Sequence, residues 1–204
     1  MEEGCRVRPG DKGFTLTYII APWLLWPFAF ILLSEHFITG MTIATAILGG
    51  LTLWKFGLLL DRKLDRRKLL VIIVYTIILF LAFAGGDKLV DILGLNQGVT
   101  QVYRSVGRSP MLILPLAWIG VWEEVYWRGG LQEKIIVERL GLPWVYSAIP
   151  YSLVHISTGN PVLVAAALVV GIVLGHEAHH YGITASSITH VSWLYLVLIL
   201  IPFS

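Results

Sequence analysis

The chain has 204 residues, of which 56% are hydrophobic and only 14% are charged, whereas about 25% of the residues of an average soluble chain are charged. Residues 13–60 contain only two charged side chains, Glu35 and Lys55, and residues 140–204 contain only one, Glu177. This composition excludes a soluble globular domain and indicates a polytopic membrane protein, and a net charge of +2 gives no reason to expect a nucleic-acid partner.

Apolar runs along the chain predict its membrane spans, because a hydrocarbon core of about 30 Å is crossed by roughly 20 helical residues. The first run is too long for the apolar part of a signal peptide, so we expect it to remain as a span. The predicted spans cover residues 14–33, 37–60, 69–84, 110–127, 143–156, 161–175 and 184–203. Residues 87–95 carry apolar side chains at helical spacing and predict a short interfacial helix or lid. The expected fold is an all-α transmembrane helical bundle in which residues 1–204 form a single domain, with about seven spans, or eight with the interfacial helix.

The loop at residues 61–68 determines the predicted orientation, because positive residues in short loops remain on the cytoplasmic side. Its basic residues are Arg62, Lys63, Arg66, Arg67 and Lys68. The N-terminal segment is then also cytoplasmic, and its basic residues are Arg6, Arg8 and Lys12. The turn at residues 34–36 has no Lys or Arg and is expected outside, whereas the basic residues of the outer segment 85–109 oppose this orientation: Lys88, Arg104 and Arg108. We expect a multi-pass protein of the cell membrane with a cytoplasmic N-terminus.

The fourth predicted span carries three charged residues, Glu123, Glu124 and Arg128, in the run W-E-E-V-Y-W-R-G. A charge inside a membrane costs about 2.5–3.5 kcal/mol even on the most lenient scale, so its presence indicates a function. Glu124 and Arg128 are i, i+4 neighbours that can pair on one helix face, whereas Glu123 points about 100° away and lacks that partner. The alternative is a fraying helix end, but the helical rise from Pro110 puts Glu123 about 10 Å inside the inner surface.

Two histidines are expected at similar depths, His155 at the end of the fifth span and His190 near the start of the seventh. A single histidine on an apolar helix is more often a packing residue. Two of them together with an unpaired glutamate, Glu123, form a plausible site for activating water. The carboxylate and one imidazole can deprotonate the water, and the second imidazole can donate to the developing oxyanion.

Three motifs in this order resemble those of the CAAX protease and bacteriocin-processing family (CPBP, or ABI), which includes the type II CAAX prenyl endopeptidases. Residues 123–128 match its EExxxR motif, and residues 151–155 match FxxxH with Tyr in place of Phe. His190 stands where the third motif, HxxxN or HxxxD, begins. The resemblance covers residues 110–200, within which all the catalytic motifs lie. It implies a glutamate-dependent intramembrane endopeptidase without a metal cofactor.

The resemblance also implies a role for each matching residue. Glu123 would be the general base that activates water, assisted by His155, and His190 would help to form the oxyanion site. Glu124 and Arg128 would support this arrangement. The implied partners are the lipid bilayer and a membrane-anchored or transmembrane protein or peptide, which is cut near its C-terminus.

The sequence departs from the family at Leu194, the fourth residue after His190, where the family has an oxyanion donor, Asn or Asp. Ser186, Ser187 and Trp193 can share the helix face of His190 and are possible replacement donors. Each of them also has an ordinary interpretation as a packing or capping residue. The departure leaves the prenylated substrate open, because other branches similar to this family act on C-terminal sorting helices or bacteriocin-related peptides.

A competing motif, H-E-x-x-H, starts at His176 and would place His176 and His180 on zinc with Glu177 as the general base. His190 could then be a third ligand. The run lies at the predicted inner boundary between two spans, where a histidine-rich turn is the simpler interpretation. The single cysteine, Cys5, lies outside any metal-ligand spacing.

A third hypothesis is a membrane protein without catalytic activity, either an immunity or scaffold protein that uses the buried charges for packing or a transporter that uses them as a relay. A transporter is expected to show inverted repeats or broken helices in matching halves, and the sequence shows neither. The prediction from the sequence is therefore a glutamic-type intramembrane endopeptidase whose catalytic cavity lies in the inner half of the bilayer.

Overall fold

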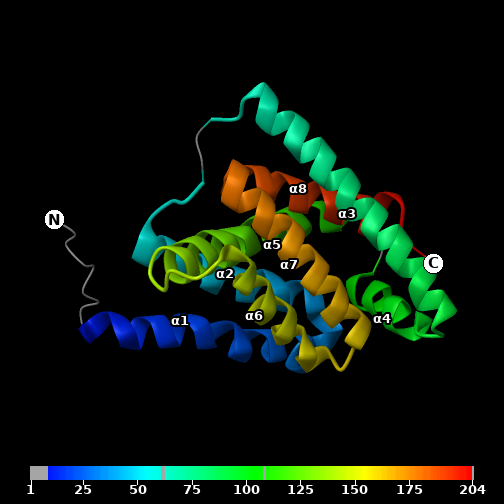
Figure 1. The fold of residues 1–204 in the computed structure, drawn as a ribbon. Coiled ribbons are helices and arrows are strands. Elements are labelled where there is room, and N and C mark those ends of the chain that lie inside the picture. The colour runs from blue at the N-terminus through cyan, green and yellow to red at the C-terminus, as the bar shows by residue number, and fades with distance from the viewer. Residues whose placement is uncertain (1–8, 61–62, 108, 204) are drawn as a thin grey trace.

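The computed structural model describes residues 9–60, 63–107 and 109–203, and this part of the chain is mostly helical and contains no strand. The predictions for several N-terminal and loop residues concern side chains outside the described part: Cys5, Arg6, Arg8, Lys12, Arg62 and Arg108. The helices form one bundle, which confirms the predicted all-α membrane architecture (Figure 1).

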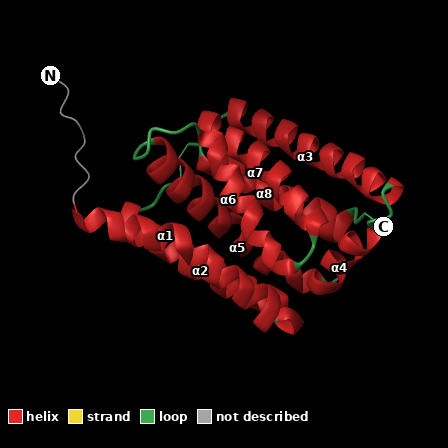
Figure 2. Cartoon of the chain, turned by 60° about the horizontal axis from the view of Figure 1, so that its bottom comes forward, coloured by secondary structure: helices red, strands yellow, loops and turns green. Residues whose placement is uncertain are grey.

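The first two helices, α1 (Pro9–Pro27) and α2 (Phe37–Phe56), form an antiparallel pair at one edge of the bundle (Figure 2). A wider helical turn, Phe28–Leu32, and a tight turn, Ser34–His36, connect them. Small residues allow helices to approach closely in a membrane, where lipid and side chains are equally apolar. Gly49 on α2 shows this, because a Cβ added there would overlap the Trp122 ring on α5.

The third helix, α3 (Arg66–Ile92), crosses the outside of the bundle at the edge opposite α1 (Figures 1 and 2). Asp65 caps its start, since the Asp65 Oδ1 atom accepts a hydrogen bond from the Lys68 backbone N at 2.8 Å. The prediction of a separate interfacial helix at residues 87–95 is wrong. Instead, α3 continues through two glycines as far as Ile92, and the chain turns at Gly94, whose φ is +70°.

The amphipathic helix of this region is α4 (Asn96–Val106), which lies at the end of the bundle near the C-terminus (Figure 1). The Tyr103 hydroxyl donates to the Val197 carbonyl at 2.9 Å. The Asn160 Nδ2 atom donates to the Gly98 carbonyl at 2.8 Å. These two hydrogen bonds attach α4 to the C-terminal half of the chain.

The central helix is α5 (Ile113–Glu124), which continues without interruption into the π-helical segment Val125–Val137. We call residues 113–137 the site helix. It extends ten residues beyond the predicted fourth span. The predicted fifth span is instead a series of short helical pieces, with α6 (Ala148–Leu153) between the turns Trp144–Ser147 and Val154–Thr158.

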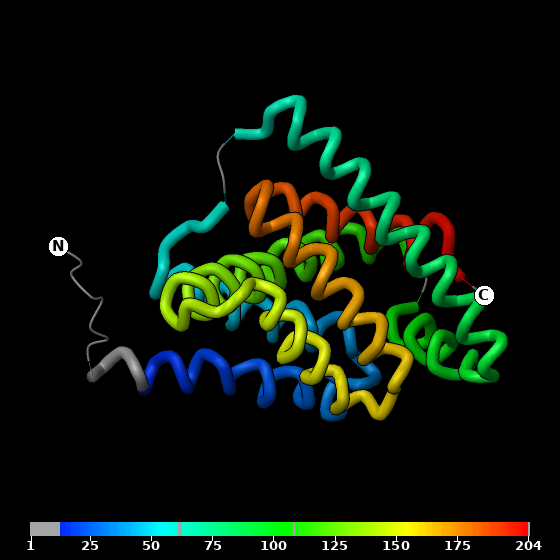
Figure 3. Tube along the Cα trace, in the orientation of Figure 1, coloured from blue at the N-terminus to red at the C-terminus, as the bar shows by residue number. Residues whose placement is uncertain are grey.

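The last two long helices are α7 (Pro161–Tyr181) and α8 (Ile183–Tyr195), and α8 extends into a wider turn, Leu196–Leu200. Asn160 caps α7, since its Oδ1 atom accepts from the Val162 and Leu163 backbone N–H groups at 3.1 and 3.2 Å. Gly182, with a φ of +96°, separates α7 from α8. The chain trace in Figure 3 shows α7 and α8 between α3 and the site helix.

Five helices in the described residues are long and apolar enough to cross a membrane: Gly13–Leu32, Ser34–Phe56, Arg66–Ile92, Pro161–Tyr181 and Ile183–Leu200. The fourth and fifth of the seven predicted spans are absent from this set. The site helix contains five charged residues, three of them at positions 123–128, and α6 has only six residues. The outer faces of α1 to α3 expose large apolar side chains, which is expected for surfaces that face lipid.

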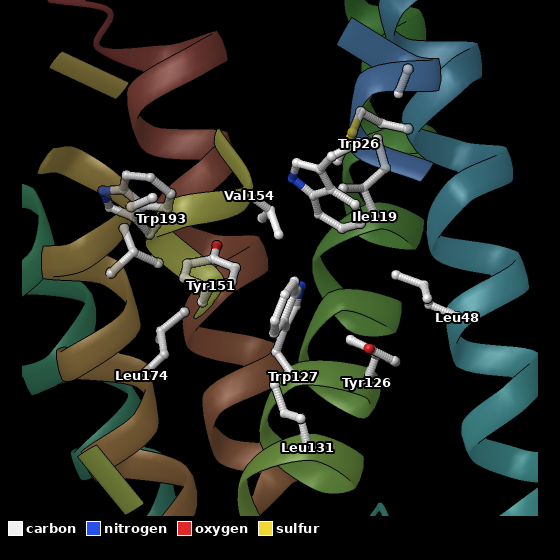
Figure 4. Close-up of a cluster of buried hydrophobic side chains, with 14 of the residues drawn as sticks. Trp26, Leu48, Ile119, Tyr126, Trp127, Leu131, Tyr151, Val154, Leu174 and Trp193 are labelled. Carbon is white, nitrogen blue, oxygen red and sulfur yellow. The ribbon is translucent and has the colours of Figure 1, made fainter. Parts of the chain in front are cut away.

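The core surrounds the π-helical half of the site helix. Trp127, Tyr126 and Leu131 are almost completely buried there. In Figure 4, Trp127 lies beside Tyr151 of α6, whereas Tyr126 points toward Leu48 of α2. The site helix is therefore enclosed by packed helices on several sides, and Glu123, Glu124 and Arg128 are removed from the surface.

Candidate active site

Three of the charged residues of the site helix are buried where the α-helix changes to a π-helix. Glu123 is 6% exposed, and Glu124 and Arg128 are 0% exposed. The π-helical hydrogen bonds join residues five apart, as between the Glu138 N–H and the Glu133 carbonyl at 2.9 Å. Such wide turns occur often at functional sites.

Glu124 has two charged or polar partners. Its Oε2 atom lies 3.6 Å from Arg128 Nε, and its Oε1 atom lies 3.1 Å from His190 Nδ1 on α8. The ionised carboxylate can only accept hydrogen bonds, so His190 Nδ1 carries the proton in this contact. The charge of Glu124 is thus balanced by neighbours from two different helices.

Arg128 is held mainly by charge and ring contacts. Its guanidinium carbon lies 4.4 Å from the centre of the Tyr151 ring. Within the described residues, none of its three guanidinium nitrogens has a hydrogen-bond acceptor. A fully buried cation with so few acceptors depends strongly on the Glu124 carboxylate.

Glu123 points to a different set of groups. The Tyr151 hydroxyl donates a hydrogen bond to Glu123 Oε2 at 3.2 Å, and His190 Nε2 lies 4.0 Å from the same oxygen. His190 therefore stands between the two glutamates, with one ring nitrogen toward each. The sequence alone predicts no role for Tyr151, although Tyr replaces the Phe of the family motif there.

His155 lies next to Tyr151, but each of its two ring nitrogens contacts a group other than Glu123. Its Nδ1 atom is 2.8 Å from the Tyr151 carbonyl, which can only accept, and its Nε2 atom is 3.4 Å from the Trp26 indole N–H, which can only donate. These partners fix the neutral imidazole with the proton on Nδ1. His155 is linked to Glu123 through Tyr151, whose carbonyl it contacts and whose hydroxyl donates to Glu123.

The three replacement donors proposed on α8 are all buried, but they differ in their contacts. The Ser186 hydroxyl donates to the Ile183 carbonyl at 3.1 Å. Within the described part of the chain, Ser187 Oγ and Trp193 Nε1 have no hydrogen-bond partner. The Trp193 ring centre lies 5.9 Å from that of His190. Ser187 and Trp193 are therefore buried donors, and Trp193 lies beside His190.

Leu194 packs against the site helix. A Cβ added at Gly120 would lie 3.3 Å from Leu194 Cδ1 and 3.0 Å from Val191 Cγ2, so α8 approaches the site helix closely at this point. The family donor position is thus occupied by an apolar contact.

The H-E-x-x-H run has its functional groups on different sides of α7. Glu177 is fully buried and accepts a hydrogen bond from Thr189 Oγ1 on α8 at 2.8 Å. His176 Nδ1 is 2.6 Å from the Tyr75 hydroxyl on α3, and the His176 and His180 ring centres are 4.4 Å apart. The residues that the structure describes contain no group of three or more His, Cys, Asp or Glu that could hold a metal ion.

Comparison with known proteins gives one match. The family model described as "Type II CAAX prenyl endopeptidase Rce1-like" matches residues 105–196, a little less than half of the chain. No curated protein and no solved structure matches the chain. The matched segment contains the site helix, α6, α7 and α8, and with the apolar helices it supports a multi-pass membrane peptidase. Residues 105–196 match the model of the same family that the three motifs predicted. The resemblance to this family is therefore confirmed.

Proposed function

We propose that this chain is a glutamate-dependent intramembrane endopeptidase in which Glu123 activates water. The observation that carries the proposal is the difference between the two buried glutamates. Glu124 is balanced by Arg128 and His190, whereas Glu123 has a neutral hydroxyl at 3.2 Å and an imidazole nitrogen at 4.0 Å. Glu123 therefore retains a carboxylate that can accept a proton.

The charges of the site support a protonated His190. Two carboxylates and one guanidinium leave a net charge of −1, and an imidazolium at His190 brings the buried group to zero. Burying unbalanced charge is costly, so the neutral total is favoured. Protonated His190 donates from Nδ1 to Glu124, and its Nε2–H faces Glu123 and the reaction site.

The reaction follows from this arrangement. Glu123 takes a proton from water while the water oxygen forms a bond to the scissile carbonyl carbon. The carbonyl π electrons move to the oxygen, and His190 Nε2–H donates a hydrogen bond to this oxyanion. When the C–N bond breaks, Glu123 returns its proton to the leaving nitrogen, which gives an amine and a carboxylic acid. No zinc takes part in these steps.

The substrate class that we propose is a membrane-anchored peptide cut near its C-terminus. The matched family name supports a prenylated CAAX sequence, while Tyr151 and Leu194 depart from the family motifs. The apolar outer faces and buried site support a substrate that reaches the protein from the membrane.

Intact-mass spectrometry of defined peptides tests this proposal. A farnesylated peptide ending in a CAAX sequence and its unprenylated counterpart are incubated with purified protein in detergent. We expect one new pair of product masses whose sum exceeds the substrate mass by the mass of one water. Glu138→Gln, which changes a half-exposed glutamate outside the site, should cleave as the wild type does. Identical masses with and without the protein, for both peptides and for a transmembrane peptide, would contradict the proposal.

A further inference from the structure

The Tyr151 hydroxyl is a buried donor at the catalytic carboxylate. Tyr151 is 4% exposed, and its hydroxyl lies 3.2 Å from Glu123 Oε2. The family motif that this segment resembles has Phe at this position, so the hydroxyl is an addition to the pattern. It is placed where the reaction would occur.

A donor is missing from the same site at Leu194. The family has Asn or Asp there, whereas the Leu194 side chain packs against Gly120 and cannot donate a hydrogen bond. Relative to the family pattern, the chain thus lacks a polar group on α8 and has an additional one on α6. Both positions face the site helix.

Two donors converge on one oxygen. The Tyr151 hydroxyl and His190 Nε2 lie 3.2 and 4.0 Å from Glu123 Oε2, and they come from two different helices, α6 and α8. A pair of convergent donors is the usual arrangement of an oxyanion site. We propose that Tyr151 supplies the second oxyanion donor of this enzyme, beside His190, and replaces the donor that Leu194 cannot provide. This inference rests on the proposed function of Glu123.

The donor changes its partner during the reaction. In the resting site the Tyr151 hydroxyl donates to the Glu123 carboxylate. When Glu123 takes the proton from water, its charge is lost, and the negative charge develops on the former carbonyl oxygen. The Tyr151 hydroxyl then donates to that oxygen, keeping its own proton throughout. When the C–N bond breaks, the oxyanion returns to a carbonyl and the hydroxyl returns to Glu123.

Neighbouring groups hold Tyr151 in position before the substrate binds. The Arg128 guanidinium lies over its ring at 4.4 Å, and the Trp127 ring contacts it edge-on with the centres 5.2 Å apart (Figure 4). His155 Nδ1–H donates to its backbone carbonyl at 2.8 Å. A fixed donor needs no reorganisation in the transition state, which is the source of its catalytic effect. His155 is a positioning residue in this arrangement.

The test is the Tyr151→Phe variant, which removes one hydroxyl and restores the family residue. We expect kcat to fall by about 10²–10³, as for other oxyanion donors, with KM and Tm close to those of the wild type. Leu194→Asn in the Tyr151→Phe background should recover at least about tenfold of the lost rate by restoring a donor on α8. Tyr146→Phe, which removes the hydroxyl of an exposed tyrosine nearby, is the matched control and should cleave normally.

The outcomes separate this inference from the proposed function. A kcat of Tyr151→Phe within threefold of the wild type, or a loss that Leu194→Asn does not reverse at all, overturns the role of Tyr151. If Glu123→Gln is inactive in the same assay, the proposed function still stands. If Glu123→Gln cleaves normally, both the proposed function and the inference are wrong.

Discussion

At the residue scale, Glu123 and Glu124 are adjacent in the sequence but have different partners, so we expect their substitutions to fail differently. Glu124→Gln removes the carboxylate beside Arg128, which is fully buried. Breaking a buried ion pair from one side costs roughly 3–5 kcal/mol. We expect a clearly lower Tm in detergent than for the Glu138→Gln control, with activity falling as a consequence. A variant that melts with the wild type would show that Arg128 does not depend on Glu124.

The sequence identifies the charged residues of the site but not all of their contacts. Glu124 and Arg128 are close in the chain, so helix geometry is sufficient to predict that they can pair. The partners of His155 are Trp26, which is 129 residues away, and a carbonyl whose direction depends on the short α6. The Trp26 contact depends on how α1 packs against the turn Val154–Thr158, and no local pattern encodes it. The Phe-to-Tyr departure at Tyr151 is the one sign in the sequence of the role that we propose for it.

At the element scale, Asn160 connects two helices, because it caps α7 and holds the Gly98 carbonyl of α4. We expect Asn160→Ala to lower stability by about 1–2 kcal/mol through loss of the cap, and further through the lost contact with α4. Asn160→Asp keeps a capping oxygen and loses the amide donor, so its Tm should lie between those of the wild type and Asn160→Ala. Thermal melting in detergent measures this order. Equal Tm values for Asn160→Ala and the wild type would show that the cap is not needed.

The sequence predicts the long apolar helices well, because their length and composition are local properties. It misplaces the interfacial helix, since two glycines at 85 and 86 are tolerated inside α3 and the amphipathic helix begins at Asn96 instead. The short pieces around α6 and the π-helical widening of the site helix also escape the pattern. Both follow from packing around buried groups, which a window of apolar residues does not report.

At the scale of the whole molecule, the basic residues between α2 and α3 predict which side of the membrane each end of the bundle faces. Single cysteines introduced into a Cys5→Ser background report this orientation. Leu64→Cys lies at an exposed position in the loop before α3. Glu35→Cys lies at an exposed position in the turn Ser34–His36. A membrane-impermeant maleimide should label Glu35→Cys in intact cells and Leu64→Cys only after permeabilisation. The reverse labelling would show that the N-terminus lies outside.

The central claim is that Glu123, and not Glu177 of the H-E-x-x-H run, activates the water. The most direct measurement compares single-turnover cleavage by Glu123→Gln and Glu177→Gln after exhaustive chelation, with the Tm of each variant. Glu123 faces Tyr151 and His190, whereas Glu177 accepts a hydrogen bond from the Thr189 hydroxyl. We predict that chelated Glu177→Gln cleaves the peptide and that folded Glu123→Gln does not. The claim would be contradicted if Glu123→Gln cleaved the peptide while Glu177→Gln did not. In that case zinc should also restore activity to the chelated wild type.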